Sequence, residues 1–196
     1  MEYKDKRRLI VGISLFLLLG IYLFKNLSAN VRVFGFIAGI VIFYLIDHMF
    51  EIKFELRHYI YMVIILAFGI LFSPLYFLVE SYDKLLHFLM PIFGSILILY
   101  IVNKQKLSIQ WKLLITFMFI ISFLTIHEIG EYLIDLFFNL KLQGVYIRDI
   151  SGIDKMNLIL SKHDDTMIDL IFGLAGSLMF TLGKSFEYFC NSLKRK

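Results

Sequence analysis

Long apolar runs separated by short polar segments dominate this chain. Six runs come close to the roughly 17–25 apolar residues that a helix needs to cross the hydrocarbon core of a bilayer. They cover residues 9–24, 31–50, 59–79, 85–102, 113–138 and 165–189. A membrane β-barrel would instead alternate polar and apolar residues at period two. The pattern therefore predicts an all-α fold, a polytopic membrane helix bundle of about six transmembrane helices, as a single domain over residues 1–196.

Composition supports a membrane protein and narrows its chemistry. Apolar residues make up 59% of the chain and charged residues 18%, whereas soluble domains have about 45–50% and about 25%. Much of the net charge of +4 comes from Lys and Arg at the two chain ends, where it flanks the membrane, so it gives no reason to expect a nucleic-acid partner. The single cysteine, Cys190, excludes an internal disulfide and a cysteine-based metal site.

The distribution of Lys and Arg in the connecting segments predicts the orientation. With the N-terminus in the cytoplasm, the cytoplasmic segments hold twelve of these residues and the opposite side holds seven. The positive-inside rule then places both termini in the cytoplasm and the long loop 139–164 outside. The first run also resembles a signal peptide with a cleavage position after Ala29, although its length and the runs that follow favour a retained helix.

Ionisable residues interrupt the last three runs at the end that faces this outer loop. Four of them occupy one quarter-turn of the run 113–138, and the two other runs each open with a pair at spacing i,i+4. At 1.5 Å per residue, all three groups lie in one layer of the membrane. These residues are Asp83, His87, His127, Glu128, Glu131, Asp135, Asp165 and Asp169.

The chemistry of this layer predicts a bound cation or shared protons. An ionised side chain at mid-bilayer costs about 2.5–3.5 kcal/mol on insertion scales, and neighbouring carboxylates oppose each other's ionisation. An oxygen-rich set with imidazoles suits a divalent metal ion such as Zn, Mn, Fe or Mg. The predicted ligands are His127, Glu131, Asp169, His87, Asp83 and Asp165, with Glu128 as the general base. The predicted substrate contacts are Asp135, Arg148, which suits a phosphate, and Asp164.

Several of the ionisable residues also have a structural interpretation. Asp83, Asp164 and Asp165 stand where helix N-caps are expected, and Ser161 with Asp164 has capping-box spacing. A lone histidine such as His87 is more often a packed side chain. Asp47, His48 and Glu51 are interpreted as boundary residues at the cytoplasmic end of the run 31–50.

Three short stretches carry a resemblance to a known family. They are residues 82–88 (YDKLLHF), 127–132 (HEIGEY) and 164–169 (DDTMID), with glycines after the last. In these stretches the chain resembles the YjdF-like family of uncharacterised prokaryotic inner-membrane proteins, and the Asp-x-x-x-His spacing is more weakly similar to VanZ-like proteins. The resemblance covers roughly residues 30–185. It implies a multi-helix fold in the plasma membrane and no particular activity.

Three functions remain open at this point. The first is a metal-dependent enzyme acting on a membrane lipid or lipid-linked substrate. The second is a transporter coupled to protons or cations, which would carry a small molecule; the confinement of the polar residues to one layer and the lack of repeated halves argue against it. The third is a non-catalytic structural protein in which the polar cluster only joins helices. The oligomeric state is not predicted.

Overall fold

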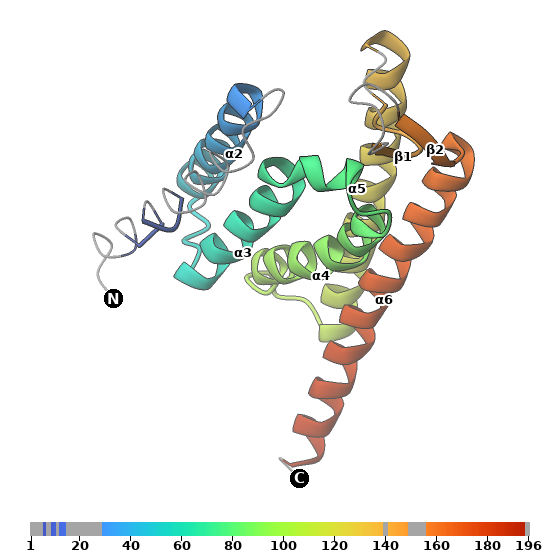
Figure 1. Cartoon of the computed structure of the whole chain (residues 1–196). Coiled ribbons are helices and arrows are strands. Elements are labelled where there is room, and N and C mark those ends of the chain that lie inside the picture. The colour runs from blue at the N-terminus through green and yellow to red at the C-terminus, as the bar shows by residue number, and fades with distance from the viewer. Residues whose placement is uncertain are drawn as a thin grey trace. The chain divides into compact units, whose positions relative to one another are not determined.

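The computed structural model describes residues 6, 9–10, 12–14, 29–138, 141–148 and 156–194. Most of the predicted first helix, 9–24, therefore lies outside the described residues. The elements are α2 (Ala29–Met49), α3 (Leu56–Leu66), the π-helix η1 (Ala67–Leu71), the 3-10 helix η2 (Ser73–Phe77), α4 (Tyr82–Val102), α5 (Ile109–Phe138), β1 (Val145–Arg148), β2 (Met156–Leu160) and α6 (Lys162–Leu193) (Figure 1).

Four helices of the described part are long and apolar enough to cross a membrane. Their spanning segments are Arg32–Met49, Tyr82–Val102, Ile109–Phe138 and Lys162–Leu193. A shorter apolar helix covers Leu56–Leu71. The predicted class, an all-α membrane bundle, is confirmed.

The third apolar run is not one continuous helix. After α3 the ladder shifts to a π-helical bond, in which Phe72 N donates to Ala67 O at 2.9 Å. The 3-10 helix η2 then begins at Ser73 and contains Pro74, which has no N–H to donate to a helical ladder. Hydropathy detects the apolar run 59–79 and is insensitive to this change of backbone geometry.

The chain divides into two compact units, Met1–Leu75 and Tyr76–Lys196. The first has an apolar core in which Phe36 of α2 packs with Leu66 and with Leu71 of η1. At the end of α2, the Asp47 side chain accepts a hydrogen bond from Phe54 N at 3.1 Å and another from the Tyr59 hydroxyl. Asp47 thus holds the turn into α3, as its interpretation as a boundary residue expects.

The second unit is built from α4, α5 and α6, which all pack against one another. Two glycines of α6 allow this approach. A Cβ on Gly176 would overlap the Phe88 carbonyl of α4, and a Cβ on Gly173 would lie 2.6 Å from a methyl of Leu124 on α5. Small residues let membrane helices approach closely in this way. The close approach brings polar side chains of α4 and α6 into direct contact.

The described residues of the predicted outer loop 139–164 include two strands and the first turn of α6. β1 and β2 pair antiparallel, with Arg148 opposite Met156, at the end of the unit where α5 finishes and α6 begins (Figure 1). The helix α6 starts at Lys162 and is capped by Ser161, whose hydroxyl accepts from Asp164 N at 3.2 Å and donates to the Asp164 carboxylate at 2.6 Å.

Candidate functional site

Polar side chains from the first turns of α4 and α6 meet around the ammonium group of Lys84. Lys84 Nζ lies 2.7 Å from Asp169 Oδ1 and 3.2 Å from Asp83 Oδ2, and it also donates to Asp165 Oδ1. The side chains of Asp165 and Asp169 are only 3% and 1% exposed. Three carboxylates therefore surround one cation in the interior of the unit.

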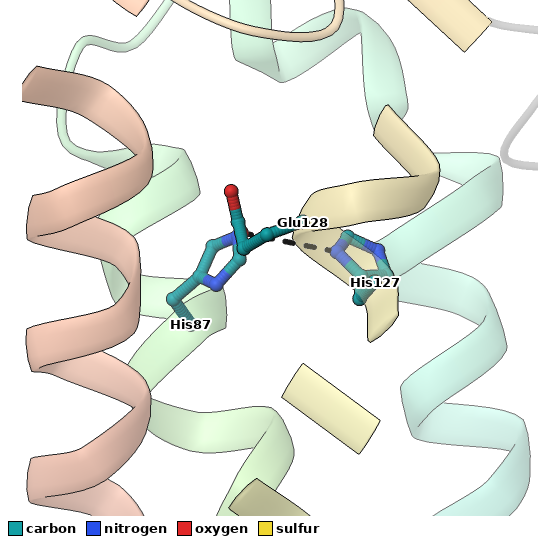
Figure 2. A group of neighbouring side chains, drawn as sticks. All are labelled: His87, His127 and Glu128. Atoms are coloured by element: carbon teal, nitrogen blue, oxygen red, sulfur yellow. Dashed lines mark ion pairs between the residues drawn. The ribbon is translucent and has the colours of Figure 1, made fainter. Parts of the chain in front are cut away.

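A second group of side chains adjoins the first and consists of two histidines and a glutamate. His87 Nε2 lies 3.6 Å from Glu128 Oε1, and His127 Nδ1 lies 4.0 Å from the same oxygen. The two imidazole rings are 5.7 Å apart and inclined at 73°. Figure 2 shows His87 on α4 and the two α5 side chains pointing toward one another.

Glu128 is the most deeply buried member of this second group. The residue is 4% exposed, and its Oε1 atom has no hydrogen-bond partner among the described residues. A buried carboxylate oxygen without a partner is unfavourable by several kcal/mol, unless a proton or a cation compensates it. In the described structure, the nearest positive groups to this oxygen are the two imidazoles.

The two groups are joined through Asp83 and His87. Asp83 Oδ1 lies 3.5 Å from His87 Nε2, one helical turn away, while Asp83 Oδ2 contacts Lys84. His127 and Glu131 are the more accessible members, with side chains 47% and 21% exposed, and His127 Nδ1 lies 3.8 Å from Glu131 Oε1. The cluster thus has a buried aspartate end, at Asp165 and Asp169, and a more accessible histidine end, at His127.

Tyr76 of η2, outside the spanning helices, adds a hydroxyl near the aspartate end. Its ring packs edge-on against Tyr82, with centroids 5.1 Å apart. Burial raises the pKa of the Tyr76 hydroxyl well above its ordinary value, and the negative charges of Asp83 and Glu131 add to this shift. Tyr76 therefore keeps its proton at neutral pH and remains a hydrogen-bond donor.

Two of the predicted site residues hold the segment between α5 and β1. Asp165 Oδ2 accepts from Gly144 N at 2.7 Å. The Asp135 carboxylate accepts from Leu142 N at 2.7 Å, from Gln143 N at 3.2 Å and from Lys162 Nζ at 3.0 Å. Asp135 thus fixes the segment that follows α5, and no contact of the described residues joins it to the histidines.

The remaining predicted substrate contacts also lie apart from the cluster. Asp164 bonds to Ser161, the N-cap residue of α6, in agreement with its structural interpretation. Arg148 is on β1, and none of the contacts described for the chain links it to the two histidines or to Lys84. Their predicted role in substrate binding remains a prediction.

Substitution of Asp135 by alanine should loosen the start of the outer loop. The variant removes three hydrogen-bond acceptor contacts that a charged group makes, each worth roughly 1.5–3 kcal/mol. We expect faster hydrogen exchange at the amides of Leu142 and Gln143, measured by mass spectrometry on the purified protein. An Asp164→Ala variant, which affects the same loop through the cap of α6, serves as the control. Unchanged exchange at both amides in Asp135→Ala would contradict this function of Asp135.

Lys84 is the central residue that the sequence patterns do not single out. Its position among the Lys and Arg of the connecting segments marks it as membrane-flanking charge. The sequence feature that could have identified Lys84 is its place inside the motif 82–88, beside Asp83 and about one turn before His87. A layer of carboxylates needs a compensating cation, and Lys84 is the basic residue within that motif.

An apolar hollow of about 580 Å³ lies at a different place in the second unit. It lies between the start of α5 and the end of α6, where Leu113, Phe117 and Phe189 are among its lining residues. None of the residues of the polar cluster lines it. The candidate site is therefore defined by converging side chains, and this hollow is not part of it.

The donor atoms form two groups that could hold a metal ion. In one, atoms of His87, His127 and Glu128 all lie within 4.8 Å of one another; in the other, atoms of Asp83, His87 and Asp169 do so. Ligand atoms around a zinc ion lie roughly 2.0–2.2 Å from it. Only the aspartate group already contains a cation, the Lys84 ammonium.

The fold and the apolar helices together define a multi-pass integral membrane protein with a buried polar cluster. The chain belongs to the family described as "Predicted membrane protein (DUF2238)", whose model matches residues 7–186. Comparison with curated proteins and with solved structures gave no match.

Proposed function

We propose that this protein is a membrane-embedded enzyme that uses one divalent metal ion and acts on a lipid or lipid-linked substrate. The ion would be held by His87, His127 and Glu128. The observation that carries this proposal is the convergence of these three side chains from two helices, with a buried Glu128 oxygen that has no hydrogen-bond partner among the described residues. Two imidazoles with one carboxylate are a ligand set of catalytic zinc sites, which keep an open coordination position.

The residues around this group suit specific roles in metal-dependent catalysis. A bound metal ion would supply Lewis acidity to a phosphoryl or carbonyl oxygen. The geometry favours Glu128 as a ligand, and it leaves the more exposed Glu131, 3.8 Å from His127 Nδ1, to accept a proton from an attacking water. Asp83 Oδ1, 3.5 Å from the same Nε2 atom of His87, would place a further carboxylate beside the ion.

The surface around His127 supports a lipid-like substrate. His127 is exposed on α5, and the neighbouring Phe123 and Ile126 are exposed by 59% and 66%. An apolar substrate tail could rest on this face while its polar group reaches the histidines. The resemblance to YjdF-like proteins and the positive-inside bias support a plasma-membrane location with both termini in the cytoplasm, which would place the site near the outer leaflet.

A non-catalytic role has its own supporting observation. Lys84 of α4 contacts Asp165 and Asp169 of α6, so the aspartate end of the cluster joins two helices directly. In this second interpretation the cluster stabilises the bundle and binds no metal. The two interpretations differ at Glu128, which makes no such link to α6 among the described contacts.

Metal analysis of the protein purified under native conditions tests the enzyme proposal. We expect about one bound Zn, Mn, Fe or Mg ion per chain. In Glu128→Gln the affinity should fall by more than the roughly 10–100-fold that loss of an outer-shell partner produces. A His163→Gln variant is the matched control, because His163 is an exposed histidine in the first turn of α6. Wild-type protein that neither retains nor takes up a divalent ion would contradict the proposal.

A further inference from the structure

We infer that the three aspartates around Lys84 form a second cation site, which the Lys84 ammonium occupies in place of a second metal ion. The presence of one metal ion in the native protein rests on the proposed function. The occupancy of the aspartate site by Lys84 does not rest on the proposed function, because this site lies at the aspartate end of the cluster alone.

The contacts of Lys84 have the form of a filled cation site. An ammonium group has three donors and no acceptor, and three carboxylates from α4 and α6 receive them. The distances from Nζ are 3.2 Å to Asp83 and 2.7 Å to Asp169, and Asp165 is also in direct contact. The Lys84 side chain is only 14% exposed, so water contributes little to this coordination.

The same carboxylates would suit a metal ion if the ammonium were absent. Atoms of Asp83, His87 and Asp169 already lie within 4.8 Å of one another. Asp165 would add a further oxygen, and its other oxygen is held by Gly144 N at 2.7 Å, which fixes its orientation. Three neighbouring carboxylates oppose each other's ionisation, so without Lys84 they require a divalent cation or protons. An oxygen-rich set of this kind favours Mn²⁺ or Mg²⁺.

Lys84 therefore determines how many metal ions the cluster can hold. His87 belongs to both groups of donor atoms, and its Nε2 atom lies between Asp83 at 3.5 Å and Glu128 at 3.6 Å. With the aspartates bound to an ammonium, His87 is available to the histidine group. Lys84 thus acts as a positioning residue that keeps the centre mononuclear.

Mn²⁺ titration of purified wild type and Lys84→Ala, followed by elemental analysis, tests this inference. We expect Lys84→Ala to bind one more Mn²⁺ ion per chain than wild type and to gain more thermal stability from Mn²⁺. Adding Asp169→Asn to Lys84→Ala should abolish the extra ion. Lys162→Ala is the matched control, since it removes a lysine at the start of α6 that pairs with Asp135 of α5 at 3.0 Å. Its ion count should equal that of wild type.

The outcomes separate this inference from the proposed function. An extra ion in Lys84→Ala supports the inference even if wild type binds none, a result that would contradict the enzyme proposal alone. Equal counts in wild type and Lys84→Ala overturn the inference, as does an equal gain in Lys162→Ala. If Lys84→Ala cannot be purified without metal, recovery by Mn²⁺ during extraction supports the inference. Failure of Mn²⁺ to recover it, while Lys84→Arg folds normally, overturns it.

Discussion

Gly176→Ala should destabilise the bundle more than any other single methyl addition among its described glycines. A Cβ at this position overlaps the carbonyl oxygen of Phe88, and it would also lie 3.1 Å from the carbonyl carbon. Both are backbone atoms of α4, so no side-chain rotation relieves the overlap and the two helices must separate. Overpacking of this kind typically costs about 1–3 kcal/mol, and separation of α4 from α6 would also lengthen the contacts of Lys84 with Asp165 and Asp169.

The measurement is the free energy of unfolding in mixed micelles. The matched control is Gly183→Ala on the same helix, where an added Cβ meets nothing within 4 Å. Alanine is a better helix former than glycine by about 0.8–1.0 kcal/mol, so the control should be neutral or more stable than wild type. Equal stability of the two variants would show that α4 and α6 do not pack at Gly176.

Removal of both α6 carboxylates should leave the buried Lys84 charge less well compensated. In the double variant Asp165→Asn with Asp169→Asn, the ammonium keeps only Asp83 as an ionised partner. Loss of the partner of a buried charge typically destabilises a protein by about 3–5 kcal/mol. We expect a loss of this size, measured as the free energy of unfolding with a chelator present, so that bound metal does not contribute.

A third substitution makes this prediction specific. Adding Lys84→Met to the double variant removes the poorly compensated ammonium, and it should restore part of the lost stability. Together with Lys84→Met alone, these variants form a double-mutant cycle, which isolates the interaction from the separate effects of the substitutions. If Lys84→Met destabilises the double variant further, the three side chains are not coupled as the structure shows.

The first prediction tests the backbone packing of α4 against α6, and the second tests the polar contacts between the same two helices. Gly176 allows the helices to approach, and the aspartates and Lys84 use that approach to form their contacts. A bundle that tolerates both changes would not hold the cluster in the observed geometry. The candidate metal site depends on the same packing, because His87 reaches Glu128 from α4.

The apolar runs alone predict the class of fold. A helix is the conformation that satisfies its own backbone hydrogen bonds in lipid, so a run of about 20 apolar residues indicates a transmembrane helix with little ambiguity. The runs that became α2, α4, α5 and α6 were predicted in this way. Spacing at i,i+4 also predicted that Asp83 and His87 share a face of α4, and their side chains do contact each other.

The tertiary structure decided which of these polar residues meet and what each one contacts. Periodicity places side chains on one helix, whereas contacts between helices depend on the rotation and closeness of their packing. Asp135 is on the same stripe as His127, yet it binds the amides of Leu142 and Gln143. Lys84 appears as flanking charge in the sequence, and it becomes the central cation because Gly176 brings α6 close to α4.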